Sequence, residues 1–217
     1  MNIYNNRILS DADLVRKVRV AAKIYRQYAE KDVLIVYAKS KKGPFFTYEF
    51  HAGNENFQHL AGVKSPKGAE VFFNRCLDDV IKLTRDEIIP KDNIKITSAK
   101  IDVLPMAIDL TKAKAYRFGE KNLITLVNSF EMVIGNKQCV MGFDKRSYQL
   151  PIPITVMDRS IYEFCTEVCS ISLIMLKSTS DEKYSEILYE VTEDIIQKAD
   201  FDEDIRKKID DAFLVES

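Results

Sequence analysis

The chain has 217 residues, and its 32 Lys and Arg nearly balance its 33 Asp and Glu, which gives a formal net charge of −1. A chain of this length can bury a core without disulfide bonds or a structural metal ion. It has no uncharged apolar run of about 18 residues, so we expect no membrane-spanning helix. The first residues lack the pattern of a secretory signal, and four cysteines in a chain of this size are typical of reduced cytoplasmic thiols.

The charges are distributed unevenly along the chain. Residues 1–180 hold 27 Lys and Arg against 20 Asp and Glu, whereas residues 181–217 hold 5 against 13. The body therefore carries +7 and the C-terminal segment −8. A basic body suits a phosphate-bearing ligand such as RNA, although a balance of this size is also common as surface scatter. The near-neutral total does not exclude a nucleic-acid partner.

Three helices and one hairpin are predicted in the first half of the chain. The helices span 11–31, 65–83 and 98–111, and the hairpin joins strands at 33–38 and 45–51. Ser10 is a suitable N-cap for the first helix, and Ser65 with Pro66 suits the start of the second. Pro105 should kink or end the third helix, because proline removes a backbone donor. The stretch 84–87 matches a capping box for a short turn.

The second half of the chain is predicted to be mainly β. Short β-rich runs occupy 123–130, 131–135, 138–144, 170–178 and 184–191, and the last two should pair as a hairpin. Pro151 and Pro153 should keep the segment 150–157 from forming a central strand of a sheet. Residues 199–214 predict an amphipathic helix from apolar side chains four residues apart, which are Phe201, Ile205, Ile209 and Phe213. The fold class is therefore α+β, with N-terminal helices followed by a mainly antiparallel sheet.

Motifs for several common chemistries are missing. The sequence has no phosphate loop, no dinucleotide-binding glycine pattern, no HExxH and no GxSxG. Cys165 and Cys169 lie four residues apart, but two thiolates make only half a zinc site, so we expect buried structural cysteines and no bound metal.

Two histidines are available for acid–base chemistry, His51 and His59. His51 ends a predicted strand and is most simply a structural strand-end residue. His59 lies in a short segment whose apolar residues can anchor it and whose Gly62 permits a sharp turn. A histidine held at such a junction can serve as a general acid or base near neutral pH, with a structural hydrogen-bonding role as the alternative.

Residues 56–63, Asn-Phe-Gln-His-Leu-Ala-Gly-Val, contain the pattern F-x-H-L-x-G. Further stretches follow in order: a helix start with Ala69, Glu70, Phe72 and Phe73, a hairpin at 134–143, a proline segment at 148–153, and a closing hairpin with Lys177, Lys183, Tyr184 and Ile187. This ordered set, over residues 33–192, resembles the phage-encoded barnase–EndoU–colicin–RelE-like (BECR) nucleases, fourth phage subgroup. Ile152 and Pro153 depart from that subgroup, where a proline precedes small polar residues.

The resemblance implies a helix followed by about four antiparallel strands, with an added hairpin and a C-terminal helix. It also implies a metal-independent, cofactor-free ribonuclease. Transesterification needs a base for the 2′-hydroxyl, an acid for the departing 5′ oxygen and positive charge for the phosphorane. The catalytic candidates are His59, Lys177, Lys183 and Tyr184, the last through its hydroxyl or as a stacking ring, and the RNA-binding candidates are Arg159, Lys64 and Lys67. For the cations, a solvated surface role is the alternative.

The expected organisation is a helical segment at 1–32, a nuclease domain at 33–192 and an acidic helix at 193–217. That acidic helix either completes the core or lies on the basic body and competes with nucleic acid. The function expected from the resemblance is a phage- or mobile-element-encoded toxin or effector that cleaves RNA in the cytoplasm of a bacterial host and has an antitoxin as a possible partner. The alternative is a non-catalytic phage regulator or anti-defence protein that uses the same fold to bind a host protein.

Overall fold

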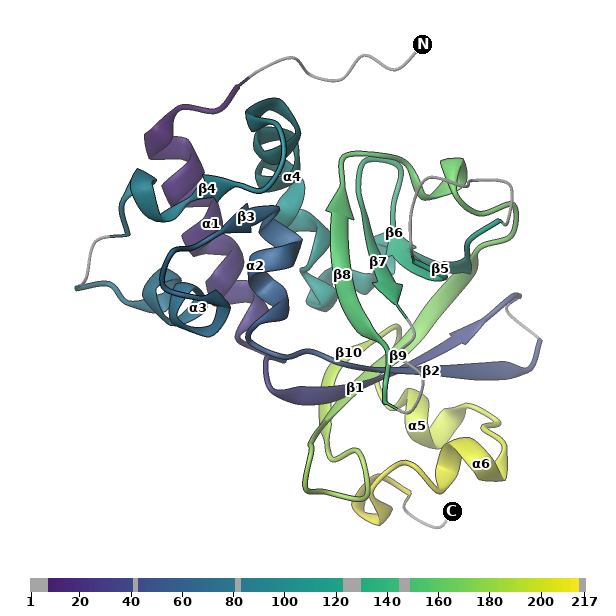
Figure 1. Cartoon of the computed structure of the whole chain (residues 1–217). Coiled ribbons are helices and arrows are strands. Elements are labelled where there is room, and N and C mark those ends of the chain that lie inside the picture. Colours follow the sequence, from purple (N-terminus) through teal and green to yellow (C-terminus); the bar gives the residue numbers. More distant parts are fainter. Residues whose placement is uncertain (1–7, 41–42, 81–82, 123–129, 145–148, 215–217) are drawn as a thin grey trace.

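The computed structural model describes residues 8–40, 43–80, 83–122, 130–144 and 149–214. Four helices form a body beside a curved antiparallel sheet, and the C-terminal segment lies below that sheet (Figure 1). The helices are α1 (Asp11–Tyr25), α2 (Asn56–Ala61), α3 (Ala69–Leu77) and α4 (Ile94–Ala107). The α+β class predicted from the sequence is confirmed. No helix in the described part of the chain is long and apolar enough to cross a membrane.

The main sheet has eight strands among the described residues, in the order β2-β1-β9-β5-β6-β7-β8, with β10 also paired to β9. Its strands are β1 (Lys31–Ala38), β2 (Phe45–His51), β5 (Arg117–Glu120), β6 (Met132–Gly135), β7 (Val140–Asp144), β8 (Ile152–Met157), β9 (Cys169–Ser178) and β10 (Glu186–Glu190). A small second sheet pairs β3 (Val63–Lys64) with β4 (Ile89–Pro90). Both predicted hairpins are confirmed, with β1 antiparallel to β2 and β9 antiparallel to β10.

The expectation of about four strands is wrong, because the two hairpins join one continuous sheet. Five consecutive residues of β1, 32–36, are buried, so this strand has apolar contacts on both faces. The backbone N–H and C=O groups of a buried strand need hydrogen-bond partners, and β1 finds them on both edges by pairing with β9 as well as with β2. The β1–β2 hairpin stands between α1 and α2, where the sequence predicted it, so the helices do not all precede the sheet.

The sheet curves until β2 and β8, the first and last strands of this order, approach each other. The N–H of His51, at the end of β2, donates to the carbonyl oxygen of Pro151, just before β8, at 2.8 Å. Pro153 lies within β8, which is an edge strand whose register against β7 shifts beside it. The sequence-based exclusion of a central strand here is confirmed, since proline has no N–H to give to a second neighbour.

The predicted C-terminal helix is wrong as a single element. The chain forms three short turns instead, α5 (Ile195–Lys198), α6 (Glu203–Arg206) and a 3-10 turn at Asp211–Phe213. The break has a backbone cause, because the N–H of Tyr184 donates to Lys208 O and the N–H of Asp210 donates to Tyr184 O. A backbone that pairs with an extended segment cannot continue as a helix.

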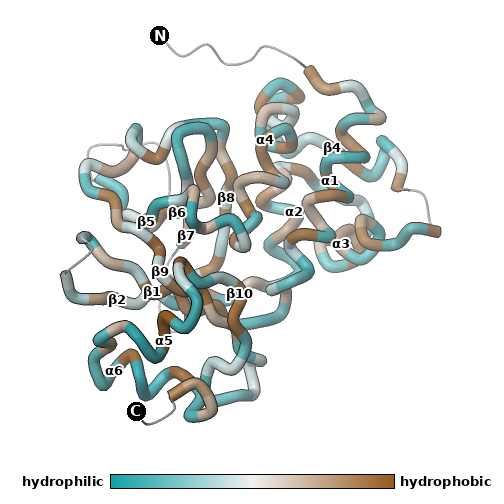
Figure 2. The backbone as a smooth tube through the Cα atoms, turned by 180° about the vertical axis from the view of Figure 1, so that it is seen from behind, coloured by the Kyte–Doolittle hydropathy of each residue, from teal (hydrophilic) through white to brown (hydrophobic). Residues whose placement is uncertain are grey.

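The C-terminal segment nevertheless fills the core role that its apolar spacing predicted. Phe201, Ile205 and Ile209 are buried against Leu34 and Met175 on the lower face of the sheet. Figure 2 shows hydrophobic and hydrophilic stretches alternating along α5 and α6, as expected for a cover with one buried side. The segment is thus part of the folded body. A separate, larger core lies between the other face of the sheet and the helices.

The structure confirms two of the predicted helix caps. Ser10 caps α1 by accepting from the Asp13 N–H, and the capping box at 84–87 is present. The second helix starts later than predicted, at Ala69, because Gly68 takes a φ of 89° that a helix cannot contain. Pro105 lies two residues before the end of α4. Of the predicted run at 123–130, only position 130 lies within the described residues. Tyr148, the first residue of the proline segment, lies outside them.

Candidate functional site

Three ionisable side chains lie in one row across the sheet, at the end where β1 begins. Asp32 on β1 is the direct cross-strand partner of His51 on β2 and of Lys177 on β9. Opposed residues of antiparallel strands point to the same face, so these three side chains project together. This face is the lower one, because Leu34, two residues after Asp32, packs into the core between the sheet and the C-terminal segment. We refer to Asp32, His51 and Lys177 as the polar row.

The Asp32 carboxylate contacts both of the other side chains of the polar row. Nδ1 of His51 lies 3.0 Å from Oδ1 of Asp32, and Nζ of Lys177 lies 3.9 Å from Oδ2. A carboxylate only accepts hydrogen bonds, so Nδ1 carries the proton and, in the neutral ring, Nε2 carries the lone pair. The side chains of Asp32 and Lys177 are 12% and 16% exposed, and that of His51 is 28% exposed. The imidazole is therefore the part of the row that reaches solvent most.

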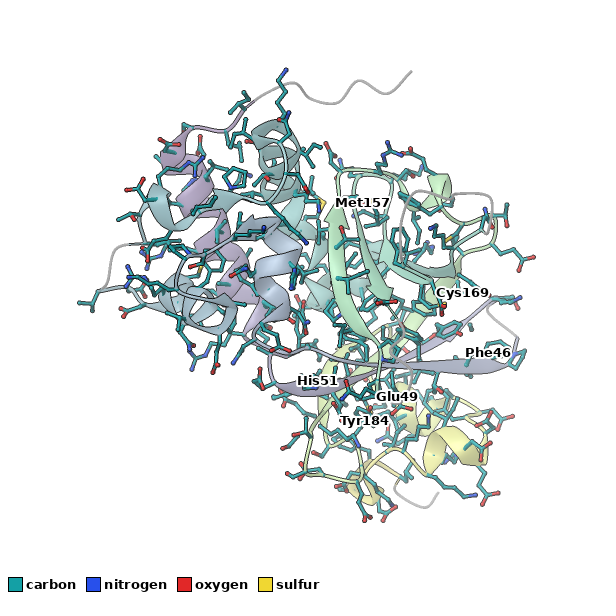
Figure 3. All side chains as sticks on the ribbon, in the orientation of Figure 1. Phe46, Glu49, His51, Met157, Cys169 and Tyr184 are labelled. Carbon is teal, nitrogen blue, oxygen red and sulfur yellow. The ribbon has the colours of Figure 1, made fainter. Side chains whose placement is uncertain are left out.

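A second layer of contacts lies beside the polar row. The Tyr184 hydroxyl donates to Oε2 of Glu49 at 2.8 Å, and Nζ of Lys208 contacts the other oxygen of that carboxylate. Nζ of Lys177 lies 5.2 Å from the centre of the Tyr184 ring, within the range of a cation–π contact. Figure 3 shows Glu49, His51 and Tyr184 gathered in one place below the sheet. The Lys177 ammonium thus lies between a carboxylate and an aromatic face.

Tyr184 is fully covered, with 1% of its surface exposed. Burial, followed by the hydrogen bond to Glu49, raises the pKa of the Tyr184 hydroxyl well above its ordinary value. The side chain stays a neutral donor, and its ring is not available to stack on a base. Its geometry suits positioning of Lys177 and Glu49.

The polar row has a local cause in the alternation of β2. Thr47, Glu49 and His51 point to the lower face, where they meet Lys208, Tyr184 and Asp32, whereas Tyr48 and Phe50 contact Phe143 on the other face. A period of two is what a strand imposes. Sequence reasoning passed over His51 and Asp32, although the alternation of polar residues at 47, 49 and 51 was a signal for this face.

The structure brings only some of the predicted site residues together. Lys177 and Tyr184 meet at the polar row. Lys183 is half-buried, and its Nζ lies 2.6 Å from Oδ1 of Asp211. His59 is exposed on α2, in the helical body, and α2 packs on β8.

The three RNA-binding candidates lie away from the row. Lys64 is exposed on β3, and Nζ of Lys67 lies 3.4 Å from Oε1 of Glu87, both within the helical body. Arg159 follows β8 two residues after Met157, which Figure 3 shows at the other end of that strand from His51. These cations do not form one surface with Lys177.

All four cysteines are free and buried. Burial raises the pKa of Cys139 to about 12 and that of Cys165 to about 11, so neither thiol is an activated nucleophile. Within the described ranges, no group of three or more His, Cys, Asp or Glu side chains is arranged to hold a metal ion.

The described residues thus form an α+β domain with a curved antiparallel sheet. Its polar row combines an imidazole, a carboxylate and an ammonium group, which are groups that acid–base chemistry uses. The family model described as phage-Barnase-EndoU-ColicinE5/D-RelE like nuclease 4 matches residues 17–210. The chain belongs to this nuclease family, as its sequence pattern predicted. The match includes most of the C-terminal segment, which the sequence pattern had left outside. No curated protein and no solved structure matches the chain.

Proposed function

We propose that this protein is an endoribonuclease that cleaves RNA by metal-independent transesterification at the polar row. Membership of a nuclease family supports the reaction class. The observation that carries the proposal is the placement of Asp32, His51 and Lys177 as direct cross-strand neighbours on one face. These three supply a base, its orienting carboxylate and a cation, which are groups that attack by a 2′-hydroxyl requires.

In the proposed reaction, Nε2 of His51 removes the proton from the 2′-hydroxyl, and O2′ attacks the adjacent phosphorus. The P–O5′ bond breaks, which leaves a 2′,3′-cyclic phosphate. Asp32 stabilises the imidazolium that forms, as its contact with Nδ1 allows. The Lys177 ammonium offers charge to the phosphorane and is the nearest proton donor of the row for the departing 5′ oxygen. Tyr184, whose ring lies beside Nζ of Lys177 and whose hydroxyl donates to Glu49, is a positioning residue. The same Nζ donates to the carbonyl oxygens of Asp181 and Glu182 at 3.0 and 3.4 Å.

The two histidines allow a direct test of the site. We expect His51→Ala to lower the cleavage rate of a labelled RNA in EDTA by about a hundredfold or more, because general-base catalysis contributes about that much. The matched variant is His59→Ala, which removes the histidine that the sequence pattern favours and which is exposed on α2. A larger loss for His59→Ala would move the site to the helical body. Intact RNA with the unmodified protein would refute the nuclease proposal altogether.

We further propose that the protein is a phage- or mobile-element-encoded toxin or effector that acts by cleaving cellular RNA, with an antitoxin as the partner that would restrain it. Expression in bacterial cells should arrest growth, and His51→Ala should relieve the arrest. One observation favours the alternative of a non-catalytic protein that binds a host protein, namely that the Asp32 and Lys177 side chains are largely covered. Growth arrest that persists in His51→Ala, together with a specific host partner recovered by co-purification, would support that alternative.

A further inference from the structure

A cavity of about 660 Å³ opens on the upper face of the sheet, away from the polar row. Tyr37, Phe118 and Met132, from β1, β5 and β6, line its apolar wall, and Lys39, Lys121 and Glu167 belong to its lining as well. Tyr37 is five residues from Asp32 along β1, which corresponds to about 17 Å and places the two side chains on opposite faces. Figure 3 shows Cys169, another lining residue, well apart from His51 and Tyr184.

The wall of this cavity contains one partly covered aromatic ring, that of Tyr37, which packs on the buried Phe118. The Tyr37 ring lies 4.5 Å from Phe118 and is stacked on Phe46 at 5.8 Å, measured between ring centres. Tyr37 is half-buried and Phe46 is 41% exposed. Partly open aromatic faces beside a cavity are suited to a flat apolar group, because such a ligand covers them from water.

Charged groups of both signs surround that aromatic wall. Nζ of Lys39 pairs with Oε2 of Glu167 at 3.1 Å, and both side chains are largely exposed. Nζ of Lys121 lies 4.8 Å from the ring centre of Phe130, so this second cation is held at the cavity. Two lysines can contact a phosphate group, and the carboxylates can accept hydrogen bonds from ring or exocyclic N–H groups.

We propose that this cavity binds a nucleotide, with its base against the half-buried Tyr37 and Met132 and its phosphate toward Lys39 and Lys121. The volume lies in the range of small-molecule sites, and the combination of aromatic wall and cations matches the two halves of a nucleotide. The ligand is a free nucleotide or one residue of an RNA strand, since the chemistry is the same. The site does not depend on the cleavage reaction, because it lies on the other face of the sheet.

Titration calorimetry of the full chain tests the proposal, with the four ribonucleoside 5′-monophosphates, ribose 5-phosphate and inorganic phosphate as probes. We expect at least one nucleotide to bind with a stoichiometry of about one and about tenfold more tightly than ribose 5-phosphate, since the base contributes stacking. Equal affinity for ribose 5-phosphate, or no saturable binding of any nucleotide, would overturn the proposal. A short single strand that binds far more tightly than every mononucleotide would identify the ligand as RNA, and similar affinities would identify a free nucleotide.

Variants locate the binding on the cavity. Tyr37→Leu should weaken nucleotide affinity about tenfold, and Lys39→Ala, which does not touch the core, about threefold or more. Lys207→Ala is the matched control, because Lys207 is equally exposed and also pairs with a glutamate, Glu203, at 3.0 Å. Unchanged affinity in Lys39→Ala, or an equal loss in Lys207→Ala, would contradict the assignment. The same titrations on His51→Ala should give unaltered affinity, which separates this site from the proposed nuclease site.

Discussion

Asp32 and His51 are direct partners across β1 and β2, and the 3.0 Å contact between Oδ1 and Nδ1 determines which imidazole nitrogen is left for a substrate. The contact orients the ring. Lys177 approaches the other oxygen of the same carboxylate. One carboxylate thus organises the whole polar row, and its removal should affect both neighbours.

The substitution Asp32→Asn tests this organisation. The asparagine amide can donate to Nδ1, which would place the imidazole proton on Nε2 and remove the base. We expect kcat/KM for RNA cleavage to fall about a hundredfold or more, by analogy with carboxylate-oriented histidines elsewhere. Asp211→Asn is the control, because Asp211 is exposed and pairs with Lys183. An Asp32→Asn protein that is folded by circular dichroism and as active as the unmodified protein would show that the contact has no catalytic role.

Lys177 should contribute through its charge. Lys177→Met keeps the length of the side chain but removes the ammonium group, and we expect single-turnover cleavage to slow by about a hundredfold, the effect of losing one electrostatic stabiliser. Lys177→Arg should retain part of the rate. The matched control is Lys198→Met, since Lys198 is 65% exposed and pairs with Asp194. Equal rates for Lys177→Met and Lys177→Arg would argue against a role for the charge.

The pairing of Asp32 with His51 was within reach of the sequence. The predicted strands at 33–38 and 45–51 imply Ala38 opposite Phe45, and the same register continued to the other end brings position 32 opposite position 51. The apolar residues of β2 alternate with polar ones, which also identifies the face that carries the polar side chains. His51 was passed over because its strand-end position had a simpler structural explanation, and His59 lay in the stretch that resembles the nuclease family.

Other features depend on pairings between distant segments, which one sequence does not reveal. Lys177 joins the polar row only because β1 pairs with β9, about 140 residues later in the chain, and local periodicity carries no information on that choice. The apolar spacing at Phe201, Ile205 and Ile209 correctly indicated a buried side. The helix failed there because Tyr184 takes up the backbone groups of residues 208 and 210, again a long-range contact.

Glu87 should make stability depend on pH. Its side chain is 8% exposed, accepts a hydrogen bond from Arg75 at 2.7 Å and closes the capping box with Thr84. These contacts lower the pKa of Glu87 to about 2, and the hydrogen bond from Arg75 has the largest effect. A depressed folded-state pKa contributes stability above the unfolded value of about 4.3, and this contribution is lost as the pH falls toward 2. Glu87→Gln should lower the free energy of unfolding at pH 7 by about 2 kcal/mol and less at pH 3.

Urea unfolding at the two pH values measures this difference. Glu203→Gln is the control, because Glu203 is 81% exposed and its pair with Lys207 should contribute little at either pH. A Glu87→Gln protein with the same loss at pH 7 and pH 3 would mean that packing or capping, without the ionised carboxylate, accounts for the effect.

The C-terminal segment gives a prediction that separates its core role from its charge. Ile209 is fully buried against the sheet, so Ile209→Ala should lower the free energy of unfolding by about 2–5 kcal/mol through the cavity it leaves.

Replacement of the exposed acids Asp200 and Glu203 by amides should leave the free energy of unfolding nearly unchanged. If the acidic segment also competes with RNA, the amide variant should bind a short RNA more tightly at low salt, and the difference should vanish at high salt. Equal RNA affinity at low salt would restrict the segment to its role in the core, and a normal stability of Ile209→Ala would mean that the sheet does not need this cover.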